Sequence, residues 1–201
     1  MTVVFKLGGS LLTLPGLEVK LQTVLDQFSD KDRLIIIGGG ASANVVRDWS
    51  RIHQLSDETA HWLAIASTDL NRQFIETLLS FRSVSNREDA TRLWSLDSSP
   101  LLLDCNRFVR VEEAKSGEPL PHNWHMTSDS IAAWTALRWP AEELVLIKSV
   151  PMPVNMTDLA ASDRDLVDPY FPQIAKDLRK ISWCNLRAPR IVIEPWLSND
   201  T

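Results

Sequence analysis

The sequence predicts an α/β fold, a three-layer αβα sandwich with a mostly parallel central sheet. Apolar segments of strand length alternate along the chain with longer segments in which apolar residues recur at helical spacing. The strand segments are apolar throughout, as expected where helices cover both faces of a sheet. Five of the seven glycines directly follow two of these strands. Ligands of such sheets bind at the carboxyl ends of the strands, so the glycines mark the expected site.

The first half of the chain is predicted to contain two strands and three helices. The strands cover 3–7 and 34–37, and the helices cover 17–28, 41–53 and a segment from 57 to about 81. Ser56 is a favoured N-cap residue directly before the third helix. Asp57 and Glu58 in the first turn of that helix complement the helix dipole.

The second half is predicted to contain three strands and two helices. The strands cover 101–104, 144–147 and 191–193, and the helices cover 128–137 and 170–180. We expect a loop over 112–123, because this segment contains one glycine and two prolines. Pro151 and Pro153 are expected to end the strand at 144–147.

Composition and charge argue against several classes of protein. The net charge is −5 and the basic residues are dispersed, so we expect no nucleic-acid partner. No apolar run approaches the roughly 20 residues of a membrane-spanning helix, and the N-terminus lacks the pattern of a signal peptide. We therefore expect a cytoplasmic protein without a membrane partner, folded as one domain over 1–201. Cys105 and Cys184 lack C-x-x-C spacing and are expected to be free thiols.

The first candidate site is Lys6-Leu7-Gly8-Gly9-Ser10, at the end of the first predicted strand. Two glycines allow the backbone to approach a phosphate closely, while Lys6 adds a charge and Ser10 a hydroxyl group. The spacing is not that of a P-loop. The alternative is a tight turn with a surface lysine, but a lysine in a strand covered on both faces needs a partner.

The second candidate site is Gly38-Gly39-Gly40, between the second predicted strand and a helix. A helix that begins at such a loop presents free backbone N–H groups to an anion. Asn44 and Arg47 lie within about a turn of that site. The alternative is a flexible turn without a ligand.

Asp129 and Lys148 are candidates at two further element ends. Asp129 lies at the start of the helix predicted at 128–137, where its alternative role is that of a helix cap. A carboxylate in a strand-end cleft can also fix the position of a lysine and share its charge. Lys148 ends the strand at 144–147 and is expected either to point into the same crevice or to be solvated. His122 and His125 have no Cys or acidic cluster to complete a metal site, so we expect none.

In their order along the first 150 residues, these segments resemble the amino acid kinase superfamily, which includes acetylglutamate, aspartate, uridylate and isopentenyl phosphate kinases. Residues 6–10 resemble the first phosphate loop of the family, and 38–41 resemble its acceptor-side loop. The segment around Asp129 resembles the one that carries an organising aspartate, and 144–147 looks like the strand before the nucleotide-side loops. Residues 56–62 resemble the helix start that faces the acceptor in phosphate-accepting members.

The resemblance implies an amino acid kinase-like fold and an ATP-dependent phosphotransferase. The catalytic residues that it implies are Lys6 and Asp129. Phosphate or nucleotide binding is implied for Gly8, Gly9, Ser10 and Lys148, and acceptor binding for Gly38, Gly39, Gly40, Asn44 and His61. The implied cofactors are ATP and Mg²⁺, with the metal ion bound to the nucleotide.

The short chain is similar to the kinases of methanofuran biosynthesis and to their relatives in bacteria with tetrahydromethanopterin-dependent one-carbon metabolism, and residues 166–172 share this similarity. Those archaeal enzymes phosphorylate (aminomethyl)furanmethyl phosphate to the diphosphate. The resemblance therefore implies a small phosphorylated acceptor as the partner. It divides the domain into an acceptor and phosphate-loop part, 1–140, and a shortened nucleotide-side part, 141–201. The many tryptophans and the habit of the fold also make a homo-oligomer, formed through a helix face, an expectation.

The nucleotide-side part departs from the family pattern. Residues 149–153 replace a Val-Asp-Gly turn, and no glycine follows Gly117. Either Lys148, Lys176 or Lys180 supplies the missing charge, or nucleotide binding is weak or lost. The alternative function is therefore a non-catalytic ligand-binding protein of the same fold. Another small-acceptor kinase, such as an isopentenyl phosphate kinase, is distinguished by its acceptor site: an acidic cleft favours the furan amine, and an apolar channel favours the isoprenoid.

Overall fold

A single seven-stranded sheet forms the centre of the molecule, in a computed structural model that describes residues 1–117, 120–153, 161–162 and 164–198. The strands have the order β3-β4-β2-β1-β5-β6-β7, and every neighbouring pair is parallel except β6 and β7. The strands are β1 (Thr2–Leu7), β2 (Asp32–Ile37), β3 (Arg82–Val84), β4 (Leu101–Leu103), β5 (Glu143–Lys148), β6 (Lys180–Asn185) and β7 (Ile193–Ser198). The predicted α/β class with a mostly parallel sheet is confirmed.

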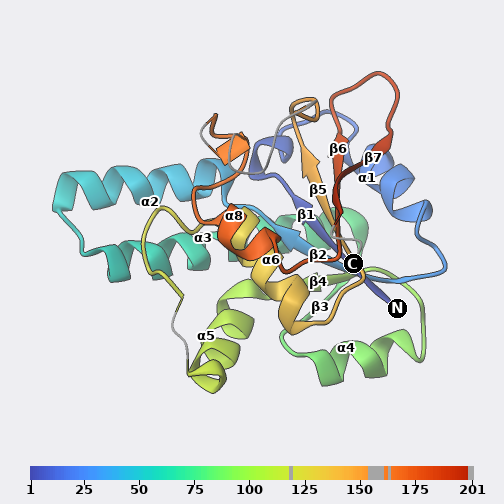
Figure 1. The fold of residues 1–201 in the computed structure, drawn as a ribbon, viewed down its shortest axis with the longest axis horizontal. Helices are drawn as coiled ribbons and strands as arrows, with labels where there is room; N and C mark the ends of the chain where they lie inside the picture. Colours follow the sequence, from blue (N-terminus) through green and yellow to red (C-terminus); the bar gives the residue numbers. More distant parts are fainter. Residues whose placement is uncertain (118–119, 154–160, 163, 199–201) are drawn as a thin grey trace.

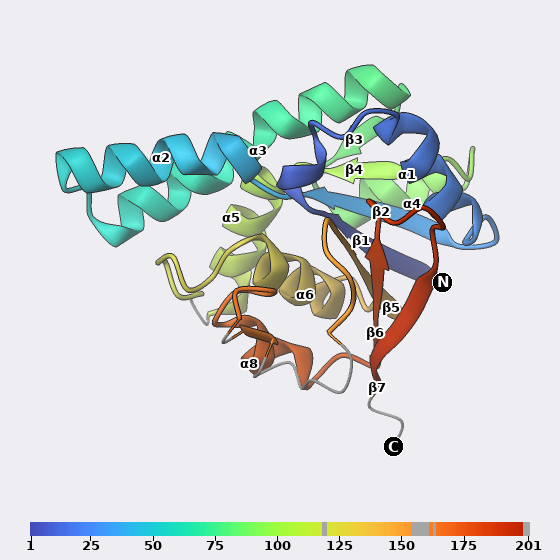
Figure 2. The ribbon, with the colours of Figure 1, turned by 90° about the horizontal axis from the view of Figure 1, so that it is seen from above.

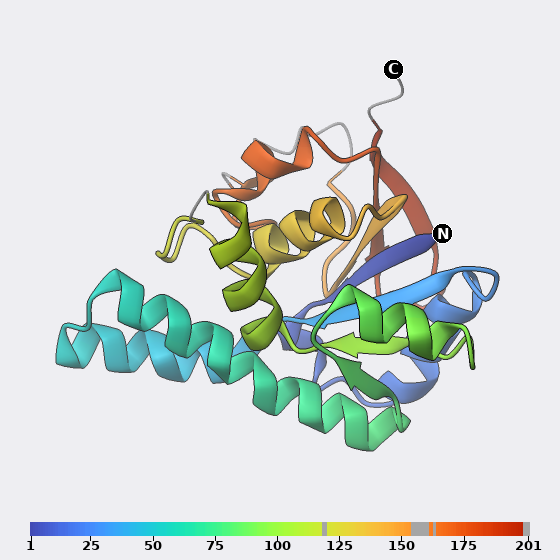
Figure 3. The ribbon, with the colours of Figure 1, turned by 90° about the horizontal axis from the view of Figure 1, so that it is seen from below.

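Helices cover both faces of this sheet (Figures 1, 2 and 3). The helices are α1 (Leu17–Asp26), α2 (Gly40–His53), α3 (Asp57–Leu79), α4 (Arg87–Trp94), α5 (Cys105–Ser116), α6 (Ser128–Arg138) and α8 (Phe171–Ala175), besides a 3-10 turn at Gly9–Leu11. One core joins side chains of α1 and the end of α3 to Val3 and Phe5 of β1. The other core joins α4, α5, α6 and α8 to Val4, because successive strand residues point to opposite faces.

The long helices α2 and α3 form a hairpin that projects from the sheet (Figure 1). The Ser56 side chain accepts a hydrogen bond from the Thr59 N–H at 3.3 Å, so the predicted N-cap of α3 is confirmed. Apolar side chains on the outer surface of this hairpin are exposed, among them Trp49 on α2 and Leu70 on α3.

The carboxyl ends of β1, β2 and β5 meet at one edge of the sheet. In the register of the sheet, Leu7 lies beside Ile37 on one side and Ile147 on the other. The two glycine loops and Lys148 follow these three residues directly. The topology therefore gathers the candidate segments, which are far apart in sequence, at a single edge.

The loop predicted at 112–123 is wrong over its first part, where residues 112–116 complete α5. Asp104 caps this helix by accepting the Arg107 N–H at 3.0 Å, and Phe108 and Val109 are buried. The helix ends where Gly117 adopts a φ of 68°. The glycine that was interpreted as part of a loop is thus the C-terminal signal of a helix. Residues 118 and 119 lie outside the described part.

The C-terminal predictions need a second correction. The helix predicted at 170–180 ends at Ala175, and Lys180 is the first residue of β6, which pairs with β5. The strand predicted at 191–193 is instead β7, which begins at Ile193. Residues 180–185 form a strand because they pair with β5. The spacing of apolar residues within this segment does not reveal that pairing. Strands β3 and β6, helix α4 and the part of α5 before residue 112 were not predicted.

Cys105 and Cys184 are free, as predicted, and both are buried. Burial raises the pKa of Cys105 to about 12 and the pKa of Cys184 to about 11, so both stay protonated thiols at neutral pH. Within the described ranges, no helix is long and apolar enough to cross a membrane.

Candidate active site

Three charged side chains predicted from the sequence meet at the edge of the sheet. Lys6 near the end of β1 lies 2.9 Å from an oxygen of Asp129 in the first turn of α6. Lys148, the last residue of β5, lies 2.7 Å from the same carboxylate. The Lys6 and Asp129 side chains are only 6% and 8% exposed. One buried carboxylate therefore holds two ammonium groups side by side.

Burial and charge together set the protonation of this cluster. Burial alone would raise the pKa of Asp129, but the charges of Lys148 and Lys6 outweigh it and lower this pKa to about 2. Burial lowers the pKa of Lys148 to about 8, so its ammonium form still prevails at neutral pH. Asp168 also acts electrostatically on Lys148 and Asp129, so two lysines and two carboxylates share this poorly hydrated place. The two lysines are the groups in it that an anionic phosphate can contact.

Asp168 fixes the start of α6, and with it Asp129. Its carboxylate accepts the N–H groups of Thr127 at 3.1 Å and Ser130 at 2.9 Å, and also the hydroxyl groups of both residues. Burial and the nearby charge of Asp129 raise the pKa of Asp168. Asp168, rather than a residue of the helix start itself, thus caps α6. Sequence reasoning did not find this role, because the capping residue lies about forty positions away from the helix start that it caps.

Two further contacts fix the end of β5. The Lys148 ammonium group donates to the Leu166 carbonyl oxygen at 2.8 Å, in addition to its bond with Asp129. The hydroxyl groups of Ser10 and Ser149 are 3.2 Å apart, which links the first glycine loop to the chain after β5. Ser10, predicted like Lys148 to bind phosphate or nucleotide, thus lies next to the residue that follows Lys148.

The two glycine loops touch each other through their backbones. A Cβ atom on Gly9 would lie 2.3 Å from the Gly40 nitrogen and 2.6 Å from the Gly38 oxygen. A Cβ atom on Gly40, where φ is 52°, would lie 2.5 Å from the Gly9 carbonyl carbon. No side chain fits between the loops. The start of α2 therefore lies directly against the loop that follows Lys6.

Two of the glycine N–H groups are engaged within the sheet. Gly8 donates to the Ile147 carbonyl oxygen at 2.9 Å, and Gly38 donates to the Leu7 carbonyl oxygen at 2.8 Å. The Gly8 N–H is therefore not available to a phosphate in this structure. For this loop, the expected phosphate contacts rest on Gly9, Ser10 and the Lys6 side chain.

Asn71 on α3 holds the second glycine loop, and sequence reasoning missed it. Its side-chain amide donates to the carbonyl oxygens of Gly38 and Gly39, each at 2.8 Å. Its oxygen accepts the Ser42 hydroxyl at 2.9 Å, and only 6% of the residue is exposed. The available signal was a polar residue one turn before Ile75 on the buried face of a helix, where burial requires hydrogen-bond partners.

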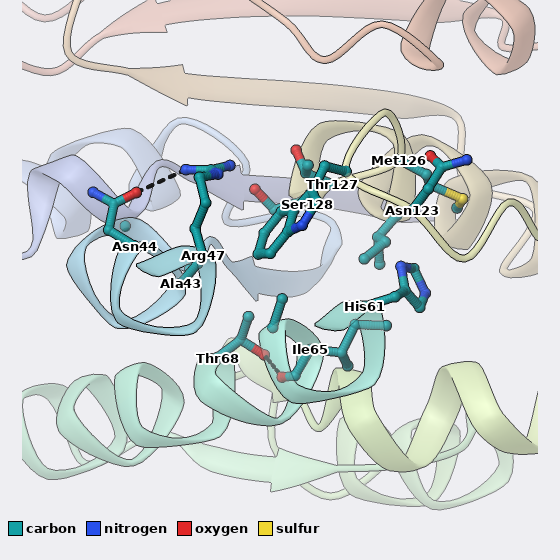
Figure 4. Close-up of a pocket in the computed structure, with 15 residues that line it drawn as sticks. Ala43, Asn44, Arg47, His61, Ile65, Thr68, Asn123, Met126, Thr127 and Ser128 are labelled. Carbon is teal, nitrogen blue, oxygen red and sulfur yellow. Dashed lines mark hydrogen bonds between the residues drawn. The ribbon is translucent and has the colours of Figure 1, made fainter. Parts of the chain in front are cut away.

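A cavity of about 220 Å³ opens between α2, α3 and residues 123–128 (Figure 4). Of the residues predicted to bind an acceptor, Gly39, Gly40, Asn44 and His61 line it, whereas Gly38 does not. The remaining lining residues are Ala43, Arg47, Ala64, Ile65, Thr68, Asn123, Trp124, Met126, Thr127, Ser128 and Ile131. The cavity is smaller than the roughly 300–1,000 Å³ of pockets for drug-sized ligands, so it suits a small molecule.

His61 is held neutral at one end of the cavity. Burial, and then the nearby charge of His122, lower the pKa of His61 to about 4. The two imidazole rings stack with their centroids 4.7 Å apart. Within the described residues, the Nε2 atom of His61 has no hydrogen-bond partner.

The nearby carboxylates are engaged elsewhere. His122 lies between Glu58 and Glu113, with its Nε2 atom 2.8 Å from the Glu113 carboxylate. Burial opposes the charged form of His122, but its bonds to Glu58 and Glu113 raise its pKa. Neither carboxylate lines the cavity. Among the described lining residues, Arg47 is the one with a formally charged side chain at neutral pH. The cavity is thus neither the acidic cleft nor the apolar channel considered from the sequence.

Comparison with protein families gives a match over most of the chain. The model of the "Amino acid kinase family" matches residues 1–152. The [5-(aminomethyl)furan-3-yl]methyl phosphate kinase of Methanocaldococcus jannaschii is 25% identical over 147 residues. This alignment spans 73% of the chain but 65% of that relative's length. The family resemblance inferred from the motifs is therefore confirmed.

Solved structures of low sequence identity share the fold. Uridylate kinase from Archaeoglobus fulgidus superposes with a TM-score of 0.62 at 17% identity, over 91% of this chain and 90% of that one. UMP kinase from Ureaplasma parvum superposes with a TM-score of 0.64 at 13% identity, over 95% of this chain and 92% of that one. Aspartate kinase from Synechocystis gives 0.65 at 12% identity, over 98% of this chain and 40% of that one.

Proposed function

Because the chain belongs to the amino acid kinase family, we propose that it transfers the γ-phosphoryl group of ATP to a small acceptor that already carries a phosphate group. The contact between Gly9 and Gly40 carries this proposal. It places the loop after Lys6 against the N-terminus of α2, and both are elements that bind phosphate groups. Two phosphate groups held there lie next to each other, as direct transfer between them requires.

Positioning and charge are the proposed means of catalysis. Bound ATP with Mg²⁺ supplies the phosphoryl group and neutralises part of its charge. Lys6 contacts the oxygens of the transferred group, and Asp129 fixes Lys6 and Lys148 around it. An acceptor phosphate oxygen forms the new bond to the γ-phosphorus as the bond to the β-phosphate breaks. The acceptor oxygen is already an anion, so no general base is needed.

The cavity beside Gly39 and Gly40 is the proposed acceptor site. Its volume of about 220 Å³ suits a small molecule, and Gly39 and Gly40 at the start of α2 line it. The M. jannaschii relative is named for a phosphorylated furan. We therefore propose [5-(aminomethyl)furan-3-yl]methyl phosphate as the first acceptor to assay, which would place the protein in methanofuran-type cofactor biosynthesis.

A second candidate function is a ligand-binding protein that has lost ATP. The absence of glycine after Gly117 favours it, because a loop without glycine limits close backbone approach to a nucleotide phosphate. Such a protein would keep the acceptor cavity and would bind the phosphorylated ligand without turnover.

Product analysis by ³¹P NMR tests the kinase proposal. The purified protein is incubated with Mg·ATP and the furan phosphate, and the expected product is the diphosphate together with ADP. The Lys6→Met variant should form neither. Lys115→Met is the matched control, since Lys115 is exposed and pairs with Glu112 on α5. Binding of the furan phosphate without any product would instead support the second candidate.

A further inference from the structure

Arg47 is a cation held in place at the wall of the cavity. Its guanidinium carbon lies 4.5 Å from the centroid of the Trp124 ring, and its Nη1 atom donates to the Asn44 side-chain oxygen at 2.8 Å (Figure 4). No carboxylate in the described ranges forms an ion pair with it. An arginine fixed by an aromatic ring and an amide, without an anionic partner, is prepared for an anion from outside the chain.

The orientation of Arg47 directs its charge toward the start of α2. Arg47 lies about two turns after Gly40, not within the single turn expected from the sequence. Helical side chains nevertheless lean toward the N-terminus of their helix. The hydrogen bond to Asn44, one turn earlier, is consistent with this direction. A guanidinium group has five N–H donors, and this bond uses one of them. The remaining donors and the first N–H groups of α2 can therefore contact the same anion.

The rest of the cavity is uncharged. Ile65, Met126 and Ile131 supply apolar surface, and no Asp or Glu is among the described lining residues. His61 lies toward the end of the cavity away from Arg47 in Figure 4, and its low pKa of about 4 keeps it neutral. An ammonium group in this cavity would have no carboxylate partner, whereas a small uncharged ring would pack against the apolar side chains.

We infer that Arg47 is the residue that determines acceptor specificity, and that the acceptor class is small phosphomonoesters recognised through their phosphate and an apolar ring rather than through an amino group. The inference rests on the proposed function and narrows it. Recognition then depends on the phosphate and the ring, and an amino group on the acceptor adds no affinity. Trp124 and Asn44 are positioning residues that act through Arg47.

Calorimetric titration without nucleotide tests this inference. The probe is furan-3-ylmethyl phosphate, which has no amino group. Replacing Arg47 by Gln should weaken its binding about 10- to 100-fold, the range expected for losing hydrogen bonds to a charged group. Arg47→Lys should lie in between, because lysine keeps the charge but not the planar fork.

The control variant is Arg51→Gln, one turn further along α2. Arg51 is exposed and pairs with Asp48, and we expect its replacement to leave binding unchanged. Arg47 is also exposed, so its replacement should not disturb the core. Thermal melting of each variant checks that the fold is intact. Binding to Arg47→Gln within twofold of the wild type, or no binding to the wild type at millimolar probe, would overturn the inference.

A second titration examines the body of the acceptor. The aminomethyl furan phosphate should bind no more tightly than the amine-free probe, and a tenfold preference for the amine would contradict the inferred class. Kinase activity is measured separately. Transfer that proceeds with an unchanged acceptor KM in Arg47→Gln refutes the role of Arg47 and leaves the kinase proposal standing. Binding that depends on Arg47 without any phosphoryl transfer would support the role of Arg47 and contradict the kinase proposal.

Discussion

The acceptor side and the β5 side of the sheet edge are built in different ways. On the acceptor side, α2, α3 and residues 123–128 enclose a cavity, and backbone contacts between two glycine loops set its geometry. On the β5 side, where we propose that the nucleotide binds, Lys148 and Ser149 are followed by a chain without glycine. The proposed acceptor site thus combines backbone contacts that set its shape with the charge of Arg47, whereas the proposed nucleotide site depends on the charge of side chains. Substitutions on one side should therefore have effects that differ from those of substitutions on the other.

The largest effect is expected where both sides meet, at Asp129. Replacing it with Asn leaves Lys6 and Lys148 close together without their counter-charge, which should cost about 3–5 kcal/mol of the free energy of unfolding. Urea denaturation measures this loss. The exposed Asp97→Asn variant serves as the control and should lose little. A loss below about 1 kcal/mol at Asp129 would show that the carboxylate is not needed to hold the lysines.

The second largest effect is expected at the backbone contact between the two glycine loops. Gly9→Ala forces a Cβ atom into the Gly40 backbone, so we expect about 3 kcal/mol of destabilisation or a displaced loop. In Gly8→Ala the nearest atom is the Ile147 oxygen at 3.2 Å, so the cost should be clearly smaller. Thermal melting compares the two variants. Equal stability of the two proteins would contradict the argument that loop contact requires a glycine at position 9.

Asn71→Asp should damage the acceptor side selectively. The carboxylate cannot donate to the Gly38 and Gly39 carbonyl oxygens, so about 2 kcal/mol of stability should be lost. The acceptor KM should rise while the KM for ATP changes little, and steady-state kinetics separate the two constants. Asn106→Asp, at a half-buried position of α5, is the control. A parallel rise in both constants would indicate a general loss of structure.

The smallest effect is a pH dependence on the β5 side. The folded pKa of Lys148, about 8, lies below its ordinary value of 10.5. The unfolded chain therefore binds more protons between these pH values, so this residue makes stability rise with pH there. Nucleotide affinity should change in the opposite direction, because binding uses the ammonium form. Above pH 8, kcat/KM for ATP should fall in the wild type, whereas Lys148→Arg should stay flat. A fall of the same size in the variant would exclude Lys148 as its source.

Local sequence signals were sufficient for the parts of the site that follow directly from strands. Lys6, Gly9, Gly40 and Lys148 were recognised because each lies at the end of an apolar strand or in the loop after it. The family match over residues 1–152 covers this same region. The parallel sheet also followed from the continuous apolar character of its strands.

The parts that were missed depend on contacts between distant segments. Asn71 acts through hydrogen bonds to a loop about thirty residues away, and Asp168 acts through hydrogen bonds to a helix start about forty residues away. The glycine at position 9 was attributed to a phosphate, and the structure adds a backbone contact with Gly40 that no local pattern records. Strand β6 was not predicted: it pairs with β5, and the predicted helix reaches only its first residue, Lys180.

Titration calorimetry with a non-hydrolysable Mg·ATP analogue tests the central claim that the β5 side, lacking glycine, still binds nucleotide. The titration is carried out with and without furan-3-ylmethyl phosphate, so that an obligatory binding order does not hide the result. We expect saturable binding that weakens in the Lys6→Ala variant. Absence of nucleotide binding up to millimolar concentration under both conditions would contradict the kinase proposal.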